Sequence, residues 1–278
     1  MNLVTQMNVT VVDAEKVSEF KMDVSHIVTV GCSFTYCQGL DDKLEIGWPA
    51  LVAKHFNAQL TNLAQPGVGN DTIYRRTSEY ICNNLQFENS KPLVIIAWSQ
   101  IDRHEQWYHQ RMVDPMFDDY HLVPKPDTLI PKDLYERVYL YHYDEVNFYR
   151  KTLLYKLNLF NLLENLGIPY ITTDYMTLDR NEKIIKVEKD FLGMAKRVNE
   201  NPFKIEDLSI INQFKPKLPC GHETAEGMVP VSNYVIDKVK ELHPNINFKN
   251  DITHLRLTDF IKTGKYHKKF PEWCHFVL

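Results

Sequence analysis

The stretch PLVIIAW at residues 92–98 predicts the strongest β-strand of the chain. A strand with one face in water would alternate apolar and polar side chains, whereas this stretch is apolar throughout. A continuous apolar run of this length is typical of a strand with both faces covered, as in the middle of a parallel sheet. We therefore expect helices on both sides of the sheet that contains residues 92–98.

Strands and helices alternate on either side of this stretch. Short β-branched runs predict the strands, and apolar residues at helical spacing predict the helices. The expected elements are strand 26–30, helix 48–56, strand 59–63, helix 70–85, strand 92–98, helix 145–166, strand 170–173 and helix 224–242. This alternation predicts the α/β class, as a three-layer α/β/α domain with a mostly parallel sheet.

Two segments depart from the alternation. Residues 99–143 are rich in aromatic residues without a clear period, and residues 176–217 are rich in charge. The C-terminal residues 243–278 carry a lysine cluster followed by aromatic residues, which favours either a docking tail or a segment that packs on the domain. We expect residues 1–278 to form a single domain with these two insertions and this C-terminal extension.

The composition excludes several classes of protein. Hydrophobic residues make up 44% of the 278-residue chain and charged residues 24%, which is usual for a soluble globular protein. No apolar run reaches the roughly 18 residues that a membrane-spanning helix needs, and the net charge of −4 argues against a general nucleic-acid binder. We expect no nucleic-acid partner and no membrane partner, and the oligomeric state stays open.

The first residues and the cysteines bear on the compartment. Residues 1–24 lack the apolar core of a secretory signal. Without such a signal, the five cysteines, an odd number, are expected to be mostly reduced thiols.

Four polar or glycine-containing segments follow the predicted strands or precede the last helix. They are residues 31–35, 62–71, 98–103 and 220–227. Since the carboxyl ends of parallel strands share one edge of a sheet, where open α/β sheets bind their ligands, we expect these segments to converge.

These segments also carry a recognisable pattern. Gly31-Cys32-Ser33-Phe34-Thr35 resembles a G-D-S block, and residues 62–67 resemble an N-x-G-x-x-G block with Ala64 at a usual glycine. Residues 97–100 stand at the place of a G-x-N-D block, and residues 221–227 are similar to a late D-G-H-P-T-A-E-G-H block. Together, over roughly residues 25–242, they resemble the SGNH (GDSL-type) hydrolase superfamily. That resemblance implies an SGNH/flavodoxin-like fold and a serine esterase chemistry that needs no cofactor.

The resemblance implies that Ser33 is the nucleophile and that His222 takes up and returns its proton. A helix N-cap is the alternative role for Ser33, and an ordinary loop position is the alternative for His222. Cys220 stands where the aspartate of the family's triad is expected, so we expect a Ser-His dyad or an incomplete triad; Cys220 as the nucleophile is a further alternative. Among other acids, Glu223 is adjacent to His222, but a neighbouring side chain in an extended segment usually points away. Asp174 and Asp207 are further candidates without a spacing argument.

The oxyanion formed in such a reaction needs hydrogen-bond donors. The resemblance implies the backbone N–H groups of Ser33 and Gly67, with the side chain of Ser99 or Gln100 as a third donor. Glycine at position 67 fits because a side chain there would block the approach to the carbonyl, although an ordinary turn glycine is the alternative.

Three further residues are candidates for substrate binding. Asn70 binds substrate or caps its helix, and Arg103 binds an anionic or hydroxylated substrate or pairs with Asp102 or Glu105. Trp98, with aromatic residues of the first insertion, stacks on a sugar ring or belongs to a hydrophobic core. Those other aromatic residues are Trp107, Tyr108, Phe117 and Tyr120. No metal site is expected, because the spacing is irregular for the four side chains His104, His109, His121 and Cys220.

The expected function is a serine esterase that removes small acyl groups, most plausibly acetyl, from a carbohydrate or similar ester. The expected partner is therefore a small acyl ester or an acylated glycan. Two alternatives stay open: a catalytically degenerate protein of the same fold that binds glycan or serves in assembly, and an O-acyltransferase. The sequence blocks also resemble those of tailed-phage proteins, so a cytoplasmic or virion-associated location is expected.

Overall fold

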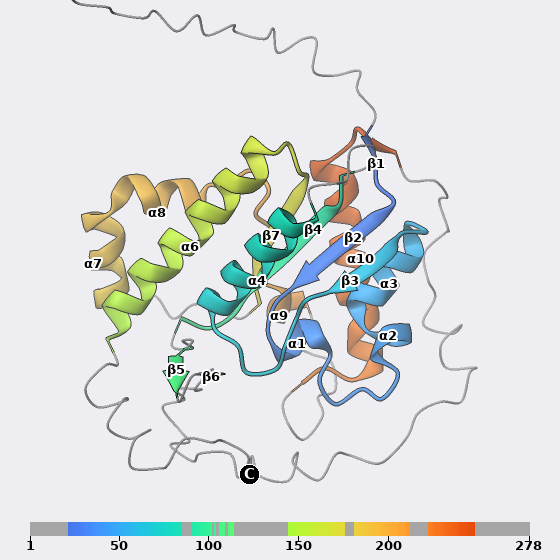
Figure 1. The fold of residues 1–278 in the computed structure, drawn as a ribbon, viewed down its shortest axis with the longest axis horizontal. Coiled ribbons are helices and arrows are strands. Elements are labelled where there is room, and N and C mark those ends of the chain that lie inside the picture. The colour runs from blue at the N-terminus through green and yellow to red at the C-terminus, as the bar shows by residue number, and fades with distance from the viewer. Residues whose placement is uncertain are drawn as a thin grey trace, which may run out of the picture.

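The computed structural model describes residues 22–84, 91–101, 103, 106–108, 111–113, 144–175, 181–211 and 222–247. Its centre is a sheet of four parallel strands in the order β3-β2-β4-β7 (Figure 1). The strands are β2 (His26–Val30), β3 (Gln59–Asn62), β4 (Leu93–Trp98) and β7 (Tyr170–Asp174). The predicted strands and their parallel arrangement are confirmed.

The sheet continues beyond β7 by a short backbone pairing. The N–H of Thr172 donates to the carbonyl of Phe203 at 3.0 Å, and the N–H of Ile205 donates to the carbonyl of Thr172 at 2.9 Å. Residues 203–205 therefore lie alongside β7 at the sheet edge, although the sequence placed them inside an insertion.

Helices cover both faces of the sheet (Figure 1). One face is covered by α3 (Trp48–His55) and α10 (Ala225–Leu242). The other is covered by α4 (Asn70–Asn83) and α6 (Glu145–Asn165). Two further helices, α7 (Glu182–Asp190) and α8 (Leu192–Asn199), pack on α6. The three-layer α/β/α arrangement expected from the sequence is the observed one.

The central strand explains why its sequence has no polar position. Every residue of β4 is buried. Alternate side chains enter opposite layers: Ile95 belongs to the core beneath α3 and α10, whereas Ile96 belongs to the core beneath α4 and α6. Because both layers are apolar, the strand carries the continuous apolar run from which the fold was predicted.

The helix ends follow local chemistry. The side chain of Asp144 accepts hydrogen bonds from two backbone N–H groups at the start of α6, as an N-cap does. The same helix ends before Gly167, whose φ of +59° is a left-handed conformation that glycine adopts without strain. The predicted end of this helix at Gly167 is confirmed.

Shorter elements complete the description. They are α1 (Ser33–Tyr36), α2 (Lys43–Ile46), α9 (Leu208–Ile211), a parallel pair of β1 (Met22–Asp23) with β8 (Ile246–Asn247), and a hairpin of β5 (Gln106–Tyr108) with β6 (Arg111–Val113). Most of the first insertion, and the C-terminal extension after residue 247, lie outside the described residues. Within the described parts of the chain, no helix has both the length and the apolar character needed to cross a membrane. The single-domain organisation stays a prediction.

Candidate active site

The first two sequence blocks meet at the carboxyl ends of β2 and β3. The side-chain amide of Asn62 donates to the carbonyl of Thr35 at 3.2 Å, and the backbone N–H of Gln65 donates to the carbonyl of Gly31 at 3.1 Å. These bonds tie the turn after β2 to the turn after β3, as expected for neighbouring parallel strands.

Gly31 makes the turn after β2 sterically possible. A Cβ at this position would lie 2.2 Å from the Thr35 hydroxyl oxygen and 2.8 Å from the carbonyl oxygen of Ala97 at the end of β4. Glycine therefore allows the chain leaving β2 to pass close to β4 and to begin α1 at once.

Ser33 is the first residue of α1. The N-cap position belongs to Cys32, which makes no side-chain capping bond, so the N-cap alternative for Ser33 is wrong. Ser33 is only 5% exposed, which leaves little room around its hydroxyl group. The turn therefore holds a nearly buried serine at the carboxyl edge of the sheet.

His222 lies against the same turn, although it is far away in sequence. Its ring packs on Phe34, the residue after Ser33, with the ring centroids 4.6 Å apart and the planes tilted by 37°. The ring of Phe34 also stacks on the ring of Tyr175, with the two ring centroids 4.3 Å apart and the ring planes at 16°. The predicted convergence of the first and fourth blocks is thus seen in a direct ring contact.

The third block joins the site through Ser99 and Arg103. The guanidinium of Arg103 donates to the Ser99 hydroxyl oxygen at 3.3 Å, and Gln100 is half-buried beside them in sequence. A Cβ at Gly69 would lie 2.3 Å from the Arg103 carbonyl oxygen, so the second and third blocks are in close contact. Arg103 therefore reaches the carboxyl end of β4. Its predicted partners Asp102 and Glu105 lie outside the described residues.

Asn70 has a different role from the two that were predicted. The N-cap of α4 is Gly69, so the capping role is wrong. The Asn70 side chain is 2% exposed; it accepts from the Ser99 N–H at 2.8 Å and donates to the Ser99 carbonyl at 3.1 Å and the Thr152 hydroxyl at 3.3 Å. Its hydrogen bonds tie α4 to the end of β4 and to α6. This internal use argues against substrate binding.

Gly67 has a backbone conformation that favours glycine. Its φ is +80°, in the left-handed region, and a Cβ there would meet no protein atom within 4 Å. The turn is therefore a reason for glycine in itself, and the predicted clearance for an approaching carbonyl stays a prediction. Its service as an oxyanion donor stays a prediction.

Trp98 belongs to the core. It is 1% exposed, its indole N–H donates to the Thr172 hydroxyl at 2.8 Å, and its ring meets Phe160 edge-on. No ring face is left for a sugar, so the core alternative holds and the predicted substrate contact does not. The aromatic residues Trp107, Tyr108, Phe117 and Tyr120 have side chains outside the described part of the chain.

Two of the weighed acids, Asp174 and Asp207, act on a lysine beside β7. Asp174, at the end of β7, forms ion pairs with Lys156 of α6 and, at 3.2 Å, with Lys204. Burial alone would raise the pKa of Asp174, but the two ammonium groups hold it below its ordinary value. Asp207 also contributes to the field at Lys156. Both carboxylates therefore act on Lys156 beside β7.

Glu223 is the residue that sequence reasoning undervalued. It was set aside because neighbouring side chains in an extended segment point in opposite directions. The structure buries it completely, at 0% exposure, close to Tyr175 and Cys37. Burial, with the charge of Glu223 adding to it, raises the pKa of Tyr175 well above its ordinary value and that of Cys37 to about 12. Side chains alternate in direction along an extended segment. The argument that excluded Glu223 as a partner of the His222 ring therefore also indicated that Glu223 points inward.

Several other predicted candidates are not tested by the geometry. Cys220, at the place of the expected aspartate, lies outside the described residues, as do His104, His109 and His121. The predictions that rest on these side chains stay predictions.

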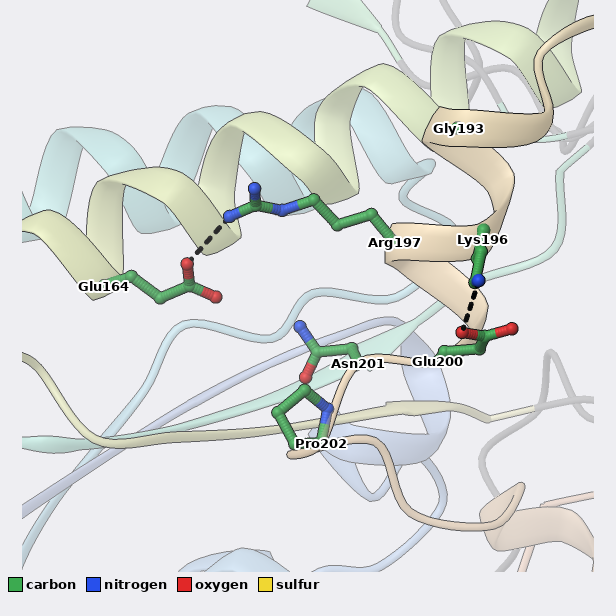
Figure 2. Close-up of a pocket in the computed structure, with 7 residues that line it drawn as sticks. All are labelled: Glu164, Gly193, Lys196, Arg197, Glu200, Asn201 and Pro202. Atoms are coloured by element: carbon green, nitrogen blue, oxygen red, sulfur yellow. Dashed lines mark hydrogen bonds and ion pairs between the residues drawn. The ribbon is translucent and has the colours of Figure 1, made fainter. Parts of the chain in front are cut away.

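A separate surface hollow of about 410 Å³ lies between α6 and α8 (Figure 2). Arg197 points from α8 towards Glu164 of α6, and their charged groups are 2.9 Å apart. Asn201 in its wall donates to the hydroxyl of Tyr170, the first residue of β7. The hollow therefore lies by the amino end of β7, at the other end of the strands from Ser33.

The comparisons with known proteins give structural likeness only. No protein-family model matches the sequence, and no curated protein matches it. The fold is similar to that of TesA, with 13% identity, a TM-score of 0.47, and coverage of 78% of this chain and 99% of TesA. It is similar to a lipolytic protein of the G-D-S-L family from Desulfitobacterium hafniense, with 12% identity, a TM-score of 0.43, and coverage of 77% and 99%. A third similar structure is an acetyl xylan esterase from the rumen bacterium Butyrivibrio proteoclasticus, with 11% identity, a TM-score of 0.45, and coverage of 80% of this chain and 65% of that one. These likenesses concern the arrangement of sheet and helices alone.

Proposed function

We propose that the protein is a serine ester hydrolase in which Ser33 is the nucleophile and His222 the general base. The observation that carries the proposal is the ring contact between Phe34 and His222, with centroids 4.6 Å apart. Phe34 directly follows Ser33, so this contact supports a serine and an imidazole that act at one edge of the sheet.

The proposed reaction follows the requirements of acyl transfer. His222 takes the proton of the Ser33 hydroxyl as its oxygen bonds to the acyl carbon, and returns it to the departing alcohol. Water then attacks the acyl-enzyme, with His222 again as the base. The backbone N–H groups of Ser33 and Gly67, with a donor from Ser99 or Gln100, stabilise the oxyanion in both steps.

The proposed substrate carries a small acyl group such as acetyl. Ser33 is 5% exposed and lies between the buried residues Cys32 and Thr35, which favours a small group over a long acyl chain. Arg103 at the end of β4 has a half-buried guanidinium that suits a hydroxylated alcohol portion, such as a sugar. We therefore propose an acetylated carbohydrate or a similar ester.

The test is hydrolysis of a chromogenic acetyl ester by the wild-type protein and by Ser33→Ala. We expect the variant to lose about 10³-fold or more of the kcat, because the attacking oxygen is gone. Ser25→Ala is the matched control, since Ser25 is an exposed serine just before the opposite end of β2. It should keep wild-type activity.

Two results would contradict the proposal. One is a wild-type protein that hydrolyses no acetyl ester, whether aryl acetate or acetylated oligosaccharide; retained binding of the oligosaccharide would then favour the non-catalytic alternative. The other is equal activity of Ser33→Ala and wild type. Adding a sugar acceptor to the same assay distinguishes acetyl transfer from hydrolysis by the product formed.

A further inference from the structure

A buried carboxylate beside the candidate site has no part in the reaction described so far. Glu223 is 0% exposed, although taking a carboxylate out of water is strongly unfavourable. Buried ionisable groups in such surroundings are concentrated at functional sites. Glu223 directly follows His222 in the sequence.

The start of α10 provides one favourable surrounding for this carboxylate. Thr224 is the N-cap of the 18-residue helix, so Glu223 comes directly before it. The backbone N–H groups at a helix N-terminus carry partial positive charge, which favours a nearby carboxylate. The start of the helix is therefore a favourable place for the carboxylate side chain of Glu223.

Two other elements face Glu223 with groups that respond to its charge. Tyr175 follows β7 directly, and its backbone N–H donates to the carbonyl of Trp98 at 3.0 Å. Cys37 ends α1 in a left-handed conformation with φ of 58°. The pKa values of the Tyr175 hydroxyl and the Cys37 thiol are both raised, first by burial and then by Glu223, so both groups lie within its field. Lys43 is the cation that acts on the same thiol.

The ring of Tyr175 continues this arrangement to His222. Tyr175 stacks on Phe34 at 4.3 Å, and Phe34 contacts His222 at 4.6 Å. The Glu223 carboxylate thus lies near the Tyr175 hydroxyl. The rings of Tyr175, Phe34 and His222 contact one another in that order. The peptide bond between His222 and Glu223 joins the last residue of this series to the first.

We propose that Glu223 is a positioning residue for His222. The inference rests on the proposed hydrolase function: Glu223 takes over the orienting role of the aspartate that the chain lacks before His222. It acts through the backbone and the stacked rings. Side chains at successive extended positions point to opposite sides, so an inward Glu223 turns His222 towards Phe34 and the sheet edge. Its negative charge also favours the imidazolium that forms when His222 accepts the proton.

The decisive variant is Glu223→Gln, which keeps the shape and removes the charge. We expect kcat to fall by about 10- to 100-fold with KM unchanged, less than the ~10⁴-fold lost when an acid bonded to the ring is removed. The acidic limb of the kcat/KM profile should move to lower pH, because a nearby negative charge raises the pKa of a histidine. Glu226→Gln is the matched control: Glu226 is an exposed carboxylate three positions later, in the first turn of α10. It should change neither kcat nor the profile.

A second measurement does not depend on activity. The ring protons of His222 are followed by NMR during a pH titration of the wild type, Glu223→Gln and Glu226→Gln. The His222 pKa should be lower in Glu223→Gln alone. If Glu223→Gln does not fold, Tyr175→Phe replaces it: this variant keeps the ring on Phe34 and removes the hydroxyl beside the carboxylate, and it should lower kcat with a shifted profile.

The outcomes separate this inference from the proposed function. An active Glu223→Gln with an unchanged pH profile and an unchanged His222 pKa overturns the positioning role and leaves the hydrolase intact. A loss of kcat with an unchanged profile and pKa shows a merely structural role and overturns it as well. If the wild type hydrolyses nothing, the hydrolase proposal fails, and the NMR titration alone decides whether Glu223 acts on His222.

Discussion

Close backbone contacts at single residues hold the candidate site together. Gly69 has an ordinary extended conformation, so nothing in its own φ requires glycine. It is the carbonyl of Arg103, 2.3 Å from the position of a Cβ, that excludes a side chain. The contact fixes the start of α4 against the chain that leaves β4.

Gly69→Ala tests this contact. We expect the free energy of unfolding to fall by about 1–3 kcal/mol, because backbone atoms must shift to admit the methyl group. Gly193→Ala is the control: a Cβ there meets nothing within 4 Å, and the residue lies in the helix α8. It should gain up to about 1 kcal/mol from helix propensity. Urea unfolding of both variants measures the difference, and equal stabilities would contradict the steric account.

Residue types in the sequence indicated the site better than they indicated each residue's role. Ser33 and His222 were identified because their segments follow a predicted strand or precede a predicted helix and resemble two blocks of the SGNH superfamily. Asn70 was expected to cap its helix, since asparagine does so often, but it bonds across to Ser99 and Thr152. Such a hydrogen bond depends on which element packs against α4, and the local sequence around Asn70 does not indicate that element.

At the scale of elements, a charged cluster joins α6 to the sheet edge. Lys156 of α6 and Asp174 of β7 form a largely buried ion pair, and Lys204 bonds the same carboxylate. Removing one partner of such a pair leaves the other charge buried and uncompensated, which costs more than the pair itself contributes.

Asp174→Asn should therefore lower the free energy of unfolding by about 3 kcal/mol near pH 7. Because the folded pKa of Asp174 is held below its ordinary value of 3.8, the contribution is fully present above that value and is lost as the pH falls through the folded pKa. The difference between wild type and variant should stay constant at mildly acidic pH and narrow in more acidic buffer. Urea unfolding over this pH range measures it.

The control for this prediction is Glu79→Gln. Glu79 pairs with Arg75 on the surface of α4 at 3.1 Å, where both side chains are well exposed. A surface pair of this kind contributes no more than about 0.5 kcal/mol. An equally small effect of Asp174→Asn would contradict the importance of the buried cluster.

The order of the elements was predictable, and the exception has a physical reason. The strands and helices around β4 have strong period signals, so their existence and order were predicted correctly. Residues 176–217 were taken as an insertion because charge dominates them. In fact α7 is clearly amphipathic: it buries Ile184 and Val187, three positions apart, so a helical period was present among the charged residues and was not used. Residues 203–205 pair with β7 through backbone hydrogen bonds. This pairing depends on the position of β7, so it leaves no pattern of residue types in the local sequence.

At the scale of the whole molecule, one buried and one half-buried histidine link stability to pH. His26 lies in β2 and His243 follows α10, and burial lowers the pKa of each below the ordinary value of 6.5. In both cases the unfolded chain binds protons more readily than the folded protein. The stability that depends on neutral histidine is therefore present above about pH 6.5 and is lost as the pH falls towards the folded pKa values.

We expect the free energy of unfolding to fall between about pH 7.5 and pH 5.5, and this slope to be smaller in the double variant His26→Gln, His243→Gln. Glutamine keeps a hydrogen-bonding side chain at both positions and does not titrate. Thermal or urea unfolding at a series of pH values measures the slope. An identical slope in the double variant would show that other groups cause it.

The topology also explains how much of the site was foreseeable. The rule that parallel strands share a carboxyl edge predicted that segments 190 residues apart would meet, and Phe34 does contact His222. The same rule says nothing about which acid supports the histidine. Glu223 matters because it is buried among Tyr175 and Cys37, and burial of that kind is a property of the packed molecule.

The central claim is that Ser33 and His222 form one reactive centre, and mapped covalent labelling tests it most directly. The protein is treated with a fluorophosphonate, digested, and the modified residue identified by mass spectrometry. We predict that Ser33 carries the label, that His222→Gln abolishes labelling, and that His243→Gln, at the amino end of β7, leaves it unchanged. A label on another residue, or labelling of Ser33 at the same rate in His222→Gln, would contradict the claim.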